Sequence, residues 1–291
     1  MARDDHRGAR RAVSHAEAGR PPSRLGRDLP AAILVGVGLG AVILISLFVA
    51  RQWFIAVVAV AIAVATWELA GALRSGGIKI AVWPALVGGQ ATLWLAWPFG
   101  ALGVLSAAAV TALACLLWRM REGPDGYLRD VSGSLFTVIY VPFFAAFAAM
   151  LVLPSDGTGR VLTWMICVVA SDVGGYAAGV VAGRHPLAPT ISPKKSWEGL
   201  AGSLAAGMVA GALCVSLLLH GHWWLGVPLG ALLVAVATAG DLIESLVKRD
   251  LGIKDMGSLL PGHGGLMERM DSLLPTAMLA WLLLSLFVPI G

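Results

Sequence analysis

The densest group of ionisable side chains in this chain lies between two long apolar runs near the C-terminus. From Ser245 to Asp271 there are eight charged residues and one histidine, although only 13% of the whole chain is charged. The acids of this segment offer oxygen ligands for a divalent cation, and its bases and glycine amides offer donors to phosphate. Phosphoryl and nucleotidyl transfer need both, so the segment predicts a phosphate-handling site at a membrane surface.

The sequence GDLIESLVKRD, which overlaps the start of this segment, places two acids and a base on one face of a predicted helix. Asp241, Glu244, Ser245 and Lys248 follow the spacing i, i+3, i+4, i+7. Two carboxylates this close repel each other unless a cation or a proton lies between them. Mg²⁺ suits such a site because it uses few carboxylates and completes its shell with water and substrate phosphates.

The sequence SDVGGYAAG carries an acid inside an apolar run, where an ionisable group is costly and therefore a candidate functional residue. Asp172, Gly175, Tyr176 and Gly179 share one helix face. This pattern indicates either a ligand bound beside exposed glycine backbone or close packing of two helices through small residues.

The sequence TISPKKSWEG follows as a polar connection. Ser192 before Pro193 predicts a helix start there, with Ser196 as the alternative N-cap. Lys194 and Lys195 would then lie at a helix N-terminus, where two ammonium groups suit a polyphosphate. Anchoring at the cytoplasmic membrane surface is the alternative interpretation.

Membrane-spanning helices must position these residues. The 291-residue chain is 58% hydrophobic with a mean hydropathy of +0.81, and its apolar runs approach the ~20 residues that cross ~30 Å of hydrocarbon. We predict an all-α polytopic membrane protein of about nine transmembrane helices, with a cytoplasmic-face polar site between the last two. The expected spans are residues 29–50, 53–73, 80–98, 100–118, 131–153, 161–182, 197–219, 223–244 and 272–289.

The positive charges fix the expected orientation and organisation. Of the 21 Lys and Arg, all but Arg51 and Arg160 fall on one side of this layout, which predicts a cytoplasmic N-terminus. We expect a disordered basic tail (1–28), N-terminal helices (29–130) and a C-terminal catalytic region (131–291). Because the charge of +4 is spread over the tail and the loops, it indicates no nucleic-acid partner. Anionic membrane lipids are a secondary binding partner of the basic tail. Glu68, inside the second span, is expected to be structural and to pair with Arg74.

The segment from Ser245 to Asp271 resembles the signature of the bacterial phosphatidate cytidylyltransferases (CDP-diacylglycerol synthases). The resemblance extends to SDVGGYAAG, SPKKSWEG, GDLIES and the nine-span layout, whereas the first 130 residues match only in hydropathy. One acid departs from the signature, because Glu268 stands where the family has Asp. The longer side chain keeps the charge but adds a methylene, so full activity is the property that it puts in question. The matching residues are Ser245, Lys248, Arg249, Lys254, Asp255, Pro261, His263, Gly264, Gly265, Arg269 and Asp271.

The resemblance implies that phosphatidate attacks the α-phosphorus of CTP at the cytoplasmic face of the bacterial inner membrane, giving CDP-diacylglycerol and pyrophosphate. It implies Mg²⁺ on Asp241 and Glu268. The implied catalytic residues are Asp241, Lys248, Arg249, His263 and Asp271. The implied substrate-binding residues are Asp172, Tyr176, Lys194, Lys195, Ser196, Glu244, Ser245, Lys254, Asp255, Gly264, Gly265 and Arg269.

Two other functions fit parts of the pattern. A CTP-dependent polyprenol kinase resembles the same superfamily but transfers the γ-phosphoryl group. A multi-span transporter would also carry polar residues in its spans, although its site would lie near the membrane midplane. Whether a second, monovalent cation assists and whether two copies form a homodimer are questions that the sequence leaves open.

Overall fold

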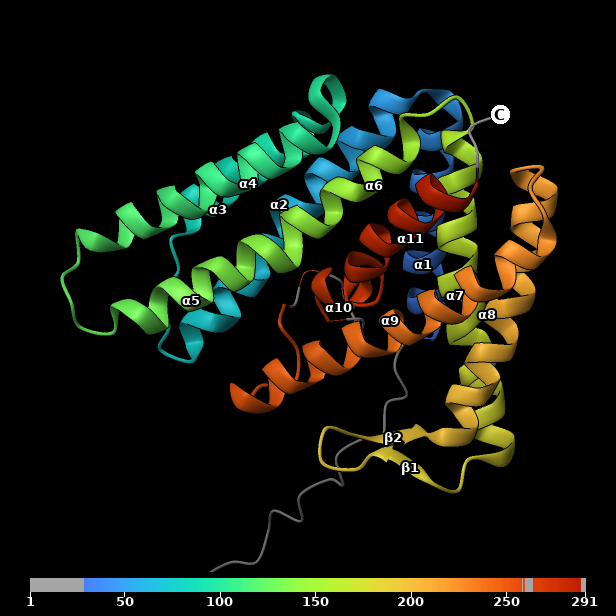
Figure 1. Cartoon of the computed structure of the whole chain (residues 1–291). Helices are drawn as coiled ribbons and strands as arrows, with labels where there is room; N and C mark the ends of the chain where they lie inside the picture. Colours follow the sequence, from blue (N-terminus) through green and yellow to red (C-terminus); the bar gives the residue numbers. More distant parts are fainter. Residues whose placement is uncertain (1–28, 258, 260–263, 289–291) are drawn as a thin grey trace, which may run out of the picture.

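The computed structural model describes residues 29–257, 259 and 264–288, so the predicted basic tail and His263 lie outside the described residues. Within these ranges the chain is almost entirely helical (Figure 1). The elements are α1 (Leu29–Val49), α2 (Arg51–Ser75), α3 (Val82–Trp94), α4 (Ala96–Met120), α5 (Tyr127–Val138), a π-helical segment (Ile139–Phe143), α6 (Phe144–Val152), α7 (Gly157–Ala182), β1 (Pro186–Ala188), β2 (Ser192–Ser196), α8 (Trp197–Leu218), α9 (Trp223–Asp250), α10 (Met267–Met270) and α11 (Leu273–Phe287).

The length and apolar composition of the helices confirm that this is an all-α membrane protein. Hydrocarbon cannot hydrogen-bond to a backbone, so a helix, which satisfies its own peptide groups, is the way for these apolar runs to cross a bilayer. Within the described residues, seven helical segments are long and apolar enough to do so. They are Arg51–Ser75, Ala96–Met120, Tyr127–Val152, Gly157–Ala182, Trp197–Leu218, Trp223–Asp250 and Met267–Phe287. Two predicted spans are not among the seven. The helix α3 has only 13 residues, about 20 Å of helix, whereas α1 has 21 residues, of which Gly36–Val49 is described as an apolar segment.

The predicted division between the third and fourth spans lies where the helices reverse direction. Gly100 has a left-handed φ of 55° and interrupts the helical backbone near the start of α4. A residue with a Cβ rarely adopts this conformation, so a glycine is favoured at this position.

The connection between α7 and α8 differs from the prediction. Residues Ser192–Ser196 form β2, which pairs in antiparallel fashion with Pro186–Ala188, so the helix start predicted at Ser192 is wrong. The alternative is confirmed: Ser196 caps α8, and its hydroxyl accepts a hydrogen bond of 3.1 Å from the Gly199 N–H. Lys194 and Lys195 therefore lie on a hairpin strand just before the helix.

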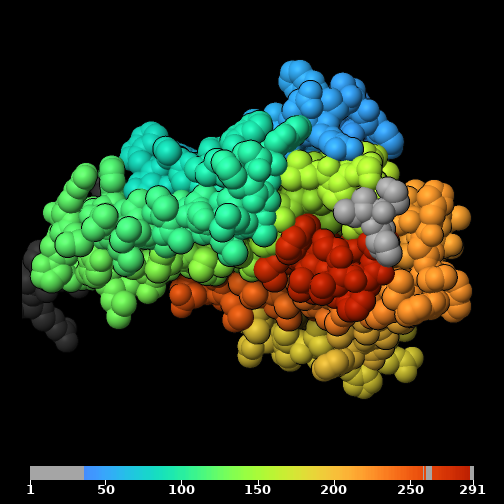
Figure 2. Space-filling model, turned by 45° about the horizontal axis from the view of Figure 1, so that its top comes forward, coloured from blue at the N-terminus to red at the C-terminus, as the bar shows by residue number. Residues whose placement is uncertain are grey.

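The helices form one bundle in which α7 and α8 pack side by side, with the hairpin at one end of that pair (Figure 1). Glycines allow this close contact, because Gly174 and Gly202 each face the other's backbone. In Figure 2 the α3–α5 region and the α8–α9 region occupy opposite sides of the visible face, and α11 lies between them. One continuous apolar core joins α2, α6, α7, α9 and α11.

Two buried arginines connect segments of the bundle that are separate in the chain. Arg119 pairs with Asp130 at 2.6 Å, and both side chains are about 1% exposed. Arg160 pairs with Asp156 and donates to the carbonyl oxygens of Leu284 and Val288, each at 2.9 Å, at the end of α11. These contacts supply the partners that a buried cation requires, and the second fixes the far end of the helix that follows the acidic site.

Candidate functional site

The site forms where α9 passes α10 and the start of α11. A Cβ at position 240 would lie against the Asp271 carbonyl oxygen, so glycine is required for this approach. The hydroxyl of Tyr140 donates to the Gly240 carbonyl at 3.0 Å and ties α9 to the middle of the bundle. The close approach places Asp241 beside Asp271, although 29 residues separate them in the chain.

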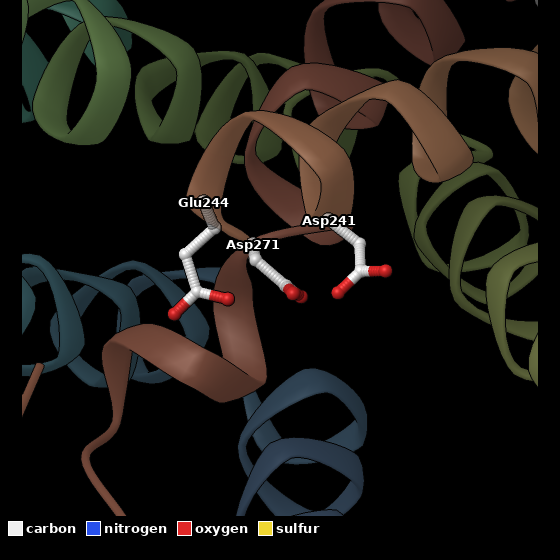
Figure 3. Close-up of side chains that lie close together, drawn as sticks. All are labelled: Asp241, Glu244 and Asp271. Carbon is white, nitrogen blue, oxygen red and sulfur yellow. The ribbon is translucent and has the colours of Figure 1, made fainter. Parts of the chain in front are cut away.

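Three carboxylates meet at this crossing. Asp241 and Glu244 extend from one face of α9, and the carboxyl group of Asp271 lies between them (Figure 3). One oxygen from each lies within 4.8 Å of the others. Glu244 is 1% exposed, and its Oε1 has no hydrogen-bond partner among the described residues. Carboxylates this close need a cation or a proton between them. The donor set of hard, partly unsatisfied oxygens fits Mg²⁺.

A pocket of about 360 Å³ opens beside this acidic cluster. We call it the polar pocket. Its walls come from α7, the hairpin, α8, α9 and the α10–α11 segment, so the site is wider than the predicted position between the last two spans. The ammonium group of Lys195 pairs with the Asp241 carboxylate inside it. Of the predicted residues, Asp172, Tyr176, Lys194, Lys195, Ser196, Asp241, Glu268 and Asp271 line it.

The packing interpretation of the SDVGGYAAG face is confirmed, and the ligand interpretation stays a prediction. Asp172, Gly175, Tyr176 and Gly179 all line the polar pocket. The same stretch also packs against α8, where a Cβ at Gly175 would meet the Ser203 side chain. The glycines therefore serve the packing of α7 on α8, and the same helix face borders the polar pocket.

A second, basic pocket of about 230 Å³ adjoins the first. Its four cations are Lys194, Lys248, Arg249 and Lys254, and no acid lines it among the described residues. Lys194 lines both pockets and so joins them. Ser245 lies in this basic pocket, and Lys248 also bonds Glu244 at 3.1 Å. Anions are attracted to the basic pocket and cations to the acidic cluster beside it.

Two glutamates hold the segment between α9 and α10. Glu268 accepts the Met256 N–H at 2.5 Å on one oxygen and the Gly265 N–H at 2.7 Å on the other. Glu68 of α2 accepts the Met267 N–H at 2.9 Å and is 8% exposed. Its structural role is thus confirmed. Its expected partner is wrong, because Arg74 bonds the Ala70 carbonyl and lies over the Trp67 ring instead.

The other predicted residues lie near the acidic cluster and the segment before α10. A Cβ at Gly264 would lie 3.5 Å from the carboxyl groups of both Asp255 and Glu268, and the Gly265 N–H donates to Glu268. Arg269 lines an apolar groove rather than either polar pocket. Sequence reasoning missed Ser203 and Tyr140, whose apolar surroundings give no local signal of their proximity to the site.

Comparison with known proteins agrees with this chemistry. A sequence model described as the cytidylyltransferase family matches residues 30–287. The chain belongs to the cytidylyltransferase family. It is 51% identical over 278 residues to a phosphatidate cytidylyltransferase of Mycobacterium bovis, covering 91% of this chain and 90% of the relative. It is 48% identical over 295 residues to a protein of the same name from Mycobacterium leprae, covering 96% and 94%. A Brucella suis protein of that name is 40% identical over 151 residues, half of this chain and 56% of the relative.

The residues that the family resemblance implied lie in the two pockets of the structure. Eight of the residues implied by the resemblance line the polar pocket, and Lys194 and four others line the basic pocket. A transporter does not fit this family. The remaining question is which bond of the nucleotide is broken.

Proposed function

We propose that this protein is a phosphatidate cytidylyltransferase, which converts CTP and phosphatidate to CDP-diacylglycerol and pyrophosphate. The observation that carries the proposal is the juxtaposition of an acidic cluster with a pocket of four cations. This arrangement fits a nucleotide triphosphate whose metal-binding and free phosphates need different partners. Relatives of that name at 48–51% identity support the choice of substrates.

In the proposed reaction, a phosphate oxygen of phosphatidate attacks the α-phosphorus of CTP. A new P–O bond forms, the bond from the α-phosphorus to the oxygen bridging the β-phosphorus breaks, and pyrophosphate leaves with that oxygen. Lys248, Arg249 and Lys254 bind the β- and γ-phosphates in the basic pocket, through charge-assisted hydrogen bonds. Lys194, which lines both pockets, stays beside the bond that breaks.

Asp241, Glu244 and Asp271 would hold the divalent cation. Mg²⁺ there supplies charge neutralisation for the phosphates during the displacement. Lys195 keeps Asp241 paired and contributes a second positive charge to the polar pocket. The assignment of Glu268 as a metal ligand stays a hypothesis, because its two oxygens already accept backbone N–H groups. Asp172 and Tyr176 line the part of the polar pocket left for the cytidine or the lipid headgroup.

We further propose that α1 and α3 complete a nine-span layout in the bacterial cytoplasmic membrane with the N-terminus inside. The polar and basic pockets would then face the cytoplasm, where CTP is available. A thiol-reactive, membrane-impermeant reagent applied to intact cells tests this orientation: a cysteine replacing Gly252 should be protected and one replacing Ser155 should react.

The direct test is turnover by purified protein. CTP and phosphatidate with Mg²⁺ should give CDP-diacylglycerol, and omission of Mg²⁺ should abolish the product. If no CDP-diacylglycerol formed while phosphatidate was the only lipid supplied, the proposed substrates would be wrong.

A further inference from the structure

A groove of about 570 Å³ lies between α1, α2, α6, α7 and the α10–α11 segment. We call it the apolar groove. Its size is that of a small-molecule site, and all its lining side chains but one are apolar. The exception is Arg269, which is exposed. The neighbouring residue, Glu268, lines the polar pocket. The four-residue helix α10 therefore borders a polar cavity and an apolar one.

The apolar groove runs away from the polar site into the span. The Met267 N–H bonds the Glu68 carboxylate, so α10 lies at the level of Glu68 along α2. The groove is lined on α2 from Trp53 to Ala61. Ala61 is seven residues before Glu68, about 10 Å at the helical rise, and Trp53 is about 12 Å further. The groove thus begins near α10 and continues toward the opposite end of α2.

We propose that the apolar groove binds an acyl chain of the phosphatidate substrate, with Arg269 facing the phosphate headgroup. This inference rests on the proposed function and assigns the lipid-binding part of that same site. Apolar side chains suit a hydrocarbon chain, and a cation at the polar end suits an anionic headgroup. A chain seated there places its headgroup at α10, two residues from Asp271 of the acidic cluster. Phosphatidylcholine presents a single phosphodiester charge that its choline neutralises, whereas the phosphomonoester of phosphatidate carries a charge of about −1.5 to −2 and suits that cation better.

Filling the groove should impair long-chain substrate selectively. Ala61 lines it, whereas Ala63 on the same helix does not, and both are half-buried. Two residues correspond to ~200° around a helix, so Ala63 faces another way. With Ala61→Phe we expect the KM for dioleoyl-phosphatidate to rise about tenfold, as if two methylenes lost their apolar contacts. The KM for dihexanoyl-phosphatidate should change less than about twofold on the same scale, and Ala63→Phe should affect neither.

Photolabelling of the unaltered protein tests the site without relying on turnover or on a folded variant. Phosphatidate with a diazirine in mid-chain should label α2 between Trp53 and Ala61 and the first turns of α11. Unlabelled phosphatidate should compete, and phosphatidylcholine should not.

Three results would overturn the groove assignment: label elsewhere on the protein, equal competition by phosphatidylcholine, or equal loss of both substrates in Ala61→Phe. Failure of the proposed function looks different. In that case the unaltered protein would make no CDP-diacylglycerol from either chain length, whatever the labelling pattern.

Discussion

Replacing Glu268 by Gln separates two roles of this carboxylate: ordering the segment before α10 or binding the metal. In the structure its two oxygens accept the N–H groups of Met256 and Gly265, at 2.5 and 2.7 Å. A carboxamide keeps one acceptor oxygen and turns an NH₂ group toward the other N–H. One charge-assisted hydrogen bond is lost, which costs about 1.5–3 kcal/mol. The ordered segment should then become roughly 10- to 100-fold less populated.

We therefore expect Glu268→Gln to lower kcat/KM for CTP by roughly 10- to 100-fold while leaving the Mg²⁺ concentration for half-maximal rate unchanged. The assay is the initial rate of CDP-diacylglycerol formation over a Mg²⁺ titration. Asp125→Asn, at an exposed acid on the distant α4–α5 connection, is the control and should match the unaltered protein. A higher Mg²⁺ requirement without loss of the saturated rate would refute the positioning role and restore Glu268 as a metal ligand.

The shorter acid at this position gives a second, independent comparison. From the family signature, Glu268→Asp is expected to keep or raise activity, because the family has Asp there. The structure predicts the opposite, since an acid one methylene shorter cannot reach both the Met256 and Gly265 amides from this backbone position. Activity equal to or above that of the unaltered protein would mean that the segment adjusts to the shorter side chain.

Three further predictions concern the site and the fold. Asp241→Asn should lower kcat at least ~100-fold through lost electrostatic stabilisation, with an unchanged Tm; near-normal turnover with Mg²⁺ would exclude Asp241 as an essential ligand. Lys195→Ala should raise the KM for CTP about tenfold. Lys79→Ala, in a loop ion pair, should not raise it. An equal rise in both variants would mean that the net charge of the protein, and not a contact of Lys195 with CTP, sets the KM. Asp130→Ala should destabilise the protein by about 1.5–3 kcal/mol, because it removes one of the two carboxylates that pair with the buried Arg119 and leaves only Glu122, and an unaltered Tm would contradict that cost.

The sequence predicted those parts of the fold that depend on local apolar length. The span expected at residues 197–219 is observed as Trp197–Leu218, and the one expected at 161–182 ends at Ala182. The hairpin was missed because a strand containing Pro193 and two lysines has no alternating apolar pattern. The apolar span was expected to end at residue 244, and the helix continues beyond it to Asp250, as the helical spacing through Lys248 predicted.

The sequence also placed residues of the site that share one helix. Asp241 and Glu244 lie on one face of α9, as their spacing predicted, and so do the four residues around Asp172 on α7. Contacts between distant segments could not be predicted in this way. Glu68 bonds a backbone amide 199 residues later, and no local pattern marks that pairing.

The fate of each phosphate of CTP tests the central claim most directly. Purified protein is given phosphatidate, Mg²⁺ and CTP labelled at either the α- or the γ-phosphorus, with Asp241→Asn as the inactive control. The proposed function predicts that the α-label enters the lipid and the γ-label leaves as pyrophosphate. Transfer of the γ-label to lipid, with release of CDP, would contradict it and show a CTP-dependent kinase instead.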